Sequence, residues 1–133
     1  VYLLEQFTVH NSQFTVKIIP GVSSINAASA AVGIPLAKAN ERVAILPAVY
    51  EDEKIRQTLK EFDTVVLMKV NKVMDKIIPL LEELDLKKSA VFISNAGLPD
   101  EEIIKDINLL RGRKLNYFSL LIVKNSSQKL PCI

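Results

Sequence analysis

Three short stretches of this chain contain residues that could bind a ligand without supplying a reactive side chain. Each stretch lies between an apolar run and a helix-like pattern, which is typical of a junction between a strand and a helix. In the first stretch, Gly21 lets a ligand approach the backbone closely, and Ser23 or Ser24 can cap the next helix while neighbouring N–H groups face a guest. The stretches are residues 20–24 (Pro-Gly-Val-Ser-Ser), 68–69 (Met-Lys) and 94–97 (Ser-Asn-Ala-Gly).

Side chains that could act as nucleophiles, bases or metal ligands are sparse and isolated. The lone histidine, His10, lies in a polar stretch without an acid or a nucleophile near it in sequence, and nothing near Cys132 in sequence would activate its thiol. The four glycines are too far apart for a G-x-G-x-x-G loop or a P-loop. If the protein is an enzyme, we expect it to bind and position reactants, without a side-chain nucleophile or a metal.

Composition narrows the class of protein. A length of 133 residues with 49% hydrophobic content predicts one domain with a substantial core. The formal net charge is +2 and both signs are spread along the chain, which argues against a nucleic-acid partner. No apolar run reaches the roughly 20 residues of a membrane helix, so we expect a soluble protein with no membrane partner. The single cysteine favours a reducing, cytoplasmic location.

Strand-like and helix-like segments alternate along the chain. Most of the expected strands are apolar throughout, as in residues 65–68, so helices should cover both faces of the sheet. The pattern predicts an α/β protein built as a layered α/β/α sheet of about five strands. The expected strands are residues 14–19, 43–46, 64–68, 90–94 and 117–123, and the expected helices are residues 24–32, 51–62, 71–84 and 99–110.

The three stretches that could hold a ligand should meet at one edge of this sheet. In an open α/β sheet, ligands bind outside the carboxyl ends of the strands. A simpler explanation is that every α/β protein needs turns at these places, and turns use glycine, asparagine and serine anyway. The pattern alone leaves both explanations open.

Five segments, in this order and spacing, carry a resemblance to a known family. Together they resemble the C-terminal half of a tetrapyrrole methylase, and the resemblance extends from Tyr2 to Lys124. The Ile-Pro-Gly-Val-Ser-Ser motif is typical of the whole family. Leu-Met-Lys-Val and Tyr-Phe-Ser-Leu-Leu-Ile-Val favour the branch that methylates precorrin-2 or cobalt-precorrin-2 in cobalamin biosynthesis. The segments are residues 18–24, 62–70, 96–99, 109–112 and 117–123.

The resemblance implies a methyltransferase of two α/β domains, usually a homodimer, that binds S-adenosylmethionine in the cleft between the domains. Residues 1–133 would then be a single domain, the C-terminal half, with residues 125–133 as a tail. The N-terminal domain, with its glycine-rich loop and Asp-Pro segment, would be absent from these residues. We therefore expect this half alone to bind the cofactor weakly and to be inactive.

The resemblance also assigns residues to the cofactor by their position in the family pattern. It implies that Ser23 and Ser24 approach the methionine part of the cofactor and that Met68 packs near its adenosine. Asn95 and Ala96 would lie near the adenine through backbone contacts, as would Ser119 or Leu120 on the last strand. The implied cofactor-binding residues are Pro20, Gly21, Ser23, Ser24, Met68, Asn95, Ala96, Ser119 and Leu120.

The implied reaction is a direct displacement in which an electron-rich carbon of a reduced tetrapyrrole attacks the sulfonium methyl group in line, without a metal. Such a substrate carries many carboxylates, and Lys69 and Lys72 are candidates to receive them. A solvated helix start is the simpler explanation of both lysines.

Two other functions stay open at this point. The chain could be a dimerisation or ligand-binding module without catalysis, which would form dimers and transfer no methyl group even with the missing half supplied. It could also belong to another tetrapyrrole methylase, with the same fold and cofactor but a different substrate.

Overall fold

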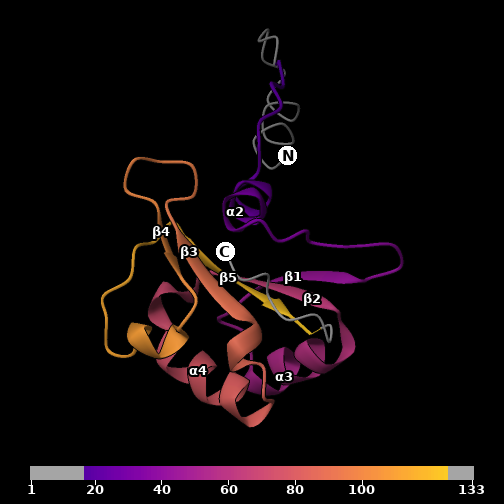
Figure 1. The fold of residues 1–133 in the computed structure, drawn as a ribbon, viewed down its shortest axis with the longest axis vertical. Coiled ribbons are helices and arrows are strands. Elements are labelled where there is room, and N and C mark those ends of the chain that lie inside the picture. Colours follow the sequence, from indigo (N-terminus) through magenta and orange to yellow (C-terminus); the bar gives the residue numbers. More distant parts are fainter. Residues whose placement is uncertain (1–16, 126–133) are drawn as a thin grey trace, which may run out of the picture.

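The computed structural model of the protein describes residues 17–125, which form a five-stranded sheet flanked by helices (Figure 1). The order of strands across the sheet is β1-β2-β5-β3-β4. The strands are β1 (Val43–Pro47), β2 (Thr64–Met68), β3 (Ala90–Ser94), β4 (Glu102–Ile104) and β5 (Ser119–Lys124). The helices are α2 (Ser24–Val32), α3 (Asp52–Glu61) and α4 (Met74–Glu83), with 3-10 turns η1 (Val70–Lys72), η2 (Lys87–Ser89) and η3 (Ile107–Leu110).

The directions of the central strands determine what meets at each edge of the sheet. β1 and β2 are parallel, while β5 is antiparallel to both of its neighbours, β2 and β3. Met68 pairs with Leu120, and Ser94 pairs with Ser119. The carboxyl ends of β2 and β3 therefore lie beside the amino end of β5.

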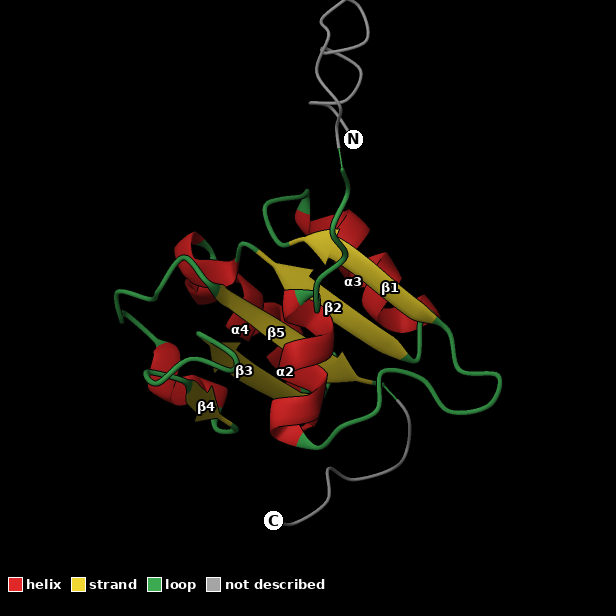
Figure 2. Cartoon of the chain, turned by 90° about the horizontal axis from the view of Figure 1, so that it is seen from above, coloured by secondary structure: helices red, strands yellow, loops and turns green. Residues whose placement is uncertain are grey.

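Helices cover both faces of the sheet, which confirms the layered α/β/α prediction. Helices α3 and α4 pack on one face, and α2 crosses the other over the central strands (Figures 1 and 2). Side chains of β2 alternate between the faces, because Val65 and Leu67 join the core under α3 and α4 whereas Val66 joins the core under α2. Two buried faces explain why the strand sequences are apolar throughout.

One capping residue at each end determines where α2 begins and ends. Ser23 has extended backbone angles and its Oγ accepts a hydrogen bond from the backbone N–H of Asn26 at 3.2 Å, which makes it the N-cap. Gly33 closes the helix in the left-handed conformation, with φ of 66°. The small residues between these caps include Ala28, which is fully buried against the sheet.

The expected strand over residues 14–19 is wrong in the part that the structure describes. Residues 17–19 belong to no strand, and the side chains of Ile18 and Ile19 are 72% and 79% exposed. An apolar run becomes a strand only when a neighbouring strand pairs with it, and this run has no pairing partner among residues 17–125.

The expected helix over residues 99–110 is also wrong. Its first half contains β4, which pairs antiparallel with β3, and its second half is the short turn η3. The β-branched pair Ile103 and Ile104 suits a strand, with Ile104 buried and Ile103 partly exposed. Asp106 then begins η3 by accepting a hydrogen bond from the backbone N–H of Asn108 at 3.1 Å.

Several expectations concern residues outside the described part of the chain. They include residues 14–16 of the first expected strand, His10, Cys132 and the tail beyond Asn125. Within residues 17–125, no helix is long and apolar enough to span a membrane.

Candidate functional site

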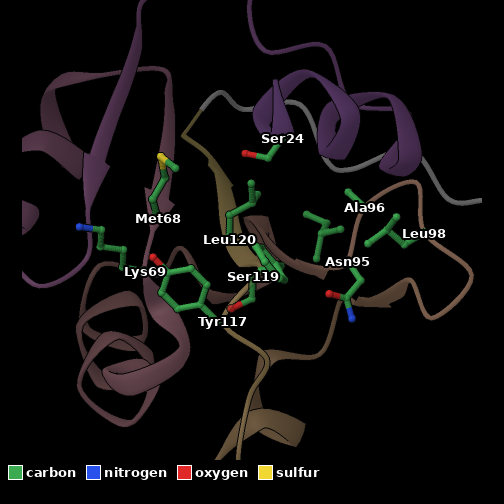
Figure 3. A pocket seen from close by; sticks show the side chains of 11 residues that line it. Ser24, Met68, Lys69, Asn95, Ala96, Leu98, Tyr117, Ser119 and Leu120 are labelled. Carbon is green, nitrogen blue, oxygen red and sulfur yellow. The ribbon is translucent and has the colours of Figure 1, made fainter. Parts of the chain in front are cut away.

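A pocket of about 250 Å³ opens at the edge where β2 and β3 end and β5 begins (Figure 3). It lies on the α2 face of the sheet, and the first residue of α2 forms part of its wall. Apolar side chains make up most of the lining. The lining residues are Ser24, Met68, Lys69, Ile93, Asn95, Ala96, Leu98, Tyr117, Phe118, Ser119 and Leu120.

β2 and β3 are each followed by a residue with left-handed backbone angles, and both of these residues line the pocket. Lys69, directly after β2, has φ of 59°, and Asn95, directly after β3, has φ of 51°. Positive φ is uncommon outside glycine, although asparagine tolerates it better than lysine does. The chain therefore leaves the sheet at Lys69 and at Asn95, and both turns lie beside the pocket.

Asn95 is anchored on three sides. Its backbone N–H donates to the carbonyl of Phe118 at 2.8 Å, which ties the end of β3 to the residue before β5. Its Nδ2 donates to Asp100 Oδ2 at 2.8 Å, and its carbonyl accepts from the N–H of Leu98 at 2.9 Å. The loop between them is held by a further bond from the N–H of Gly97 to Glu101 Oε2 at 2.7 Å.

Asn116 organises the start of β5. Its Oδ1 accepts from the N–H of Phe118 at 2.9 Å, and its carbonyl accepts from Ser119 Oγ at 2.7 Å. Tyr117 and Phe118 face each other edge to face with ring centroids 5.5 Å apart, and both are largely exposed. The pocket thus has an aromatic rim that is open to a partner or a ligand.

The sequence-derived site residues divide into two groups. The pocket brings together seven of them, namely Ser24, Met68, Lys69, Asn95, Ala96, Ser119 and Leu120. Four are not in its lining. Pro20 and Gly21 lie in the exposed segment before α2, Ser23 caps that helix, and Lys72 lies exposed in η1.

Four lining residues were missed by the sequence reasoning. Ile93 and Leu98 flank a predicted stretch, so extending that stretch by one residue on each side would have included them. Tyr117 and Phe118 precede a strand instead of following one. They reach the pocket because β5 is antiparallel to β2 and β3. The local sequence does not predict the direction of a strand in the sheet.

Shifted pKa values occur away from the pocket. The hydrogen bond from Lys124 lowers the pKa of Glu41, and the hydrogen bond from Arg56 lowers the pKa of Glu83. The groups concerned are Glu41, Arg56, Glu82 and Glu83. Within residues 17–125, no three His, Cys, Asp or Glu side chains cluster as metal ligands. The pocket has the means to bind and orient a ligand through apolar walls and a few polar groups.

The fold and the sequence together define the family. The chain belongs to the Tetrapyrrole (Corrin/Porphyrin) Methylases, whose family model matches residues 1–107. It is similar to the cobalt-precorrin-2 C(20)-methyltransferase of Salmonella typhimurium, with 33% identity over 80% of this chain and 46% of that protein. It is also similar to the probable cobalt-precorrin-2 C(20)-methyltransferase of Methanocaldococcus jannaschii, with 32% identity over 82% of this chain and 46% of the relative.

Solved structures share the fold. A cobalt precorrin-4 methyltransferase superposes with a TM-score of 0.65 and 18% identity, over 92% of this chain and 57% of that structure. The uroporphyrin-III C-methyl transferase of Thermus thermophilus, in complex with S-adenosylhomocysteine, superposes with a TM-score of 0.61 and 20% identity, over 93% of this chain and 56% of that structure. The chain spans about half the length of the relatives that it matches.

Proposed function

We propose that this chain is the C-terminal domain of an S-adenosylmethionine-dependent precorrin-2 or cobalt-precorrin-2 C(20)-methyltransferase of cobalamin biosynthesis. The observation that carries the proposal is the pocket, because residues from α2, β2, β3 and β5 that lie far apart in sequence line one cavity. The similarity to two cobalt-precorrin-2 methyltransferases supports the choice of substrate.

The pocket has the character of half of a cofactor site. Its volume of about 250 Å³ is below the roughly 300–1,000 Å³ of complete small-molecule sites, so a second wall is needed. Ser24 at the start of α2 would face the methionine part of the cofactor, and Met68 would pack on its adenosine. Asn95 and Ala96 would lie near the adenine, as would Ser119 or Leu120. Ser23 would act through its cap on α2, with Pro20 and Gly21 leading into that helix.

The proposed methyl transfer requires the protein to orient the two reactants and to exclude water from them. S-adenosylmethionine supplies an electrophilic sulfonium methyl group when it is bound. Ser24, Met68 and Asn95 would hold the cofactor so that this methyl group faces a carbon of the tetrapyrrole. The side chains of Ile93, Leu98 and Leu120 exclude water from the ligand, while the anchored loop after β3 holds the ligand in line.

Lys69 is the better placed of the two lysines proposed to receive substrate carboxylates. It lines the pocket, and its exposed side chain makes no hydrogen bond or ion pair with another residue of the described part. Lys72 is exposed one 3-10 turn further on. A free lysine at the mouth of a pocket can pair with a carboxylate of an incoming substrate.

The assembly and location belong to the same proposal. The protein would act as a homodimer in the cytoplasm on a small tetrapyrrole, without nucleic-acid or membrane partners. Support comes from the single cysteine and from a net charge near zero. Size-exclusion chromatography with light scattering measures the oligomeric state, and a monomer would contradict this part.

The test joins the chain to its N-terminal half and measures two quantities. Methyl transfer from labelled S-adenosylmethionine to precorrin-2 and to cobalt-precorrin-2 reports activity, and calorimetry with S-adenosylhomocysteine reports binding. We expect Ser24→Leu to weaken binding at least about tenfold by placing a larger side chain in the wall of the pocket. The control is Ala31→Leu, which adds the same side chain at an exposed position near the other end of α2.

Each outcome separates the candidate functions. Binding and transfer to precorrin-2 or its cobalt form support the proposal. Binding without transfer to any tetrapyrrole supports a module without catalysis. Transfer to a different tetrapyrrole supports another methylase of the family. Equal effects of both leucine substitutions would remove Ser24 from the site.

A further inference from the structure

The carboxamide of Asn95 is a polar group in the pocket whose orientation follows from its neighbour. Asn95 is 7% exposed, and its Nδ2 lies 2.8 Å from Asp100 Oδ2 and 3.5 Å from the carbonyl oxygen of Asp100. A carboxylate and a carbonyl only accept hydrogen bonds, so the nitrogen must face Asp100 and the oxygen must face away from it. Figure 3 shows the oxygen of Asn95 on the side of Ser119 and its nitrogen turned away.

The oxygen of this carboxamide has no donor from the protein. Within residues 17–125, no group donates a hydrogen bond to Asn95 Oδ1. Thr64 Oγ1 is the one side-chain nitrogen or oxygen in that range that is both sealed from solvent and without a partner. Asn95 Oδ1 also lacks a partner, so it must be accessible to solvent. An accessible acceptor on a nearly buried residue of a pocket is suited to a donor on a ligand.

The surroundings indicate what kind of ligand group would donate. Ile93, Leu98 and Leu120 provide apolar walls, which favour a flat and uncharged ring. Asp100 adds a negative charge directly behind Asn95, which disfavours an anionic group there. A heteroaromatic ring that carries an amino group satisfies both conditions, because the ring packs on the walls and an N–H reaches Oδ1.

We infer that Asp100 is a positioning residue that makes the pocket selective for a 6-amino purine over a 6-oxo purine. This inference rests on the proposed function, which brings an adenine to Asn95. With Nδ2 held by Asp100, a 6-oxo group would place two acceptors face to face and leave both without a donor. A carboxamide free to rotate would present either Oδ1 or Nδ2 and would accept both purines.

The experiment compares S-adenosylhomocysteine with S-inosylhomocysteine by calorimetry on the protein joined to its N-terminal half. The two compounds differ at position 6 of the purine and in the proton that the 6-oxo ring carries on N1. The unmodified protein should bind the adenosine compound about 10- to 100-fold more tightly. Asp100→Asn keeps the size of the side chain but can satisfy Asn95 in either orientation, so the ratio of the two affinities should fall to within about threefold of one. The melting temperature of each variant reports folding.

The matched control is Glu101→Gln, which also removes one negative charge from the same loop. Glu101 accepts a hydrogen bond from the N–H of Gly97 and, in the described residues, makes no hydrogen bond with the carboxamide of Asn95. Its glutamine variant can still accept that bond, so the affinity ratio should stay at the value of the unmodified protein. A role for Asp100 in loop order alone would change both affinities together and leave their ratio intact.

The possible failures are distinguishable. If the unmodified protein binds neither compound, the proposed function is wrong. If it binds both equally well, the proposed cofactor stands and the inference is overturned, and this comparison needs no variant. The inference is also overturned if Asp100→Asn keeps the ratio or if Glu101→Gln lowers it equally.

Discussion

The two ends of the central strands are built in opposite ways. At the end where β2 begins and β5 finishes, the charged and amide groups satisfy one another, and the hydroxyl of Thr64 is the one buried side-chain polar group of the described residues without a partner. Lys124 Nζ lies 2.6 Å from Glu41 Oε2, and both side chains are largely buried. Asn125 donates from its backbone N–H to the carbonyl of Asp63 at 2.7 Å and from Nδ2 to the carbonyl of Leu59 at 2.8 Å.

The opposite end leaves its groups available. Tyr117, Phe118 and Leu98 expose more than half of their surface, Lys69 has no partner in the described part of the chain, and Asn95 Oδ1 has no donor there. Paired polar groups at one end stabilise the fold. Unpaired polar groups and exposed apolar surface at the other end can still form favourable contacts when a ligand or a partner binds. Substitutions at the two ends should therefore change different properties.

The largest effect is expected from filling the open end. Ala96→Phe adds a large side chain to a wall of the pocket, so affinity for S-adenosylhomocysteine should fall about 100-fold, equivalent to about 2.7 kcal/mol. Calorimetry on the protein joined to the proposed N-terminal half measures the affinity, and thermal unfolding measures the cost of a larger side chain beside the core under α2, against which Ala96 packs. A variant that binds normally would contradict the location of the site, and one that loses stability instead would contradict the division between the ends.

At the closed end, Glu41→Gln should lower the melting temperature by several degrees at pH 7 and leave ligand affinity unchanged. The substitution leaves the nearly buried Lys124 without a negative partner. Lys124 lowers the pKa of Glu41 in the folded protein, so the stabilisation is complete above the unfolded pKa of about 4.3 and is lost as the pH falls through the folded value.

Melting temperatures measured from pH 7 down to pH 3 check this prediction. The difference between the unmodified protein and Glu41→Gln should shrink once the pH falls below about 4.3, because a protonated Glu41 resembles glutamine. The control is Glu51→Gln, whose ion pair with Lys54 is 3.5 Å long and mostly exposed, and it should have little effect. A difference that is constant with pH would contradict the role of the charge.

The smallest effect should come from Asn125→Ala. The variant loses the side-chain hydrogen bond to Leu59 and keeps the backbone bond to Asp63, so the free energy of unfolding should fall by about 1 kcal/mol. Urea unfolding measures the change. Asn40→Ala, at an exposed turn position, serves as the control. Equal changes in both variants would mean that this bond adds nothing to the closed end.

Features that depend on neighbouring residues could be predicted from the sequence. Ser23 and Gly33 begin and end α2 as their types indicate, and the apolar strands β2 and β3 lie where expected. The layered sheet follows from those strands. The stretches after β2 and β3 could be assigned to the site because polar residues follow a buried strand in each.

Features that depend on partners distant in sequence could not be predicted. Residues 102–104 form a strand only because β3 lies beside them, and the acidic residues before them suggested a helix start although Asp100 and Glu101 hold a loop. The aromatic rim at Tyr117 was missed because the direction of β5 is set by its two neighbours. Ile18 and Ile19 suggested a strand, yet no strand pairs with them in the described range.

The position of β5 has a consequence for how the chain matures during translation. Among residues 17–125 it is the last strand in sequence, yet it pairs with both β2 and β3 at the centre of the sheet. Until it has left the ribosome, β2 and β3 each present an unpaired edge to other nascent chains and to chaperones. A stop codon before Ser119 would leave the β1-β2 and β3-β4 pairs unjoined, and the ligand pocket would never form.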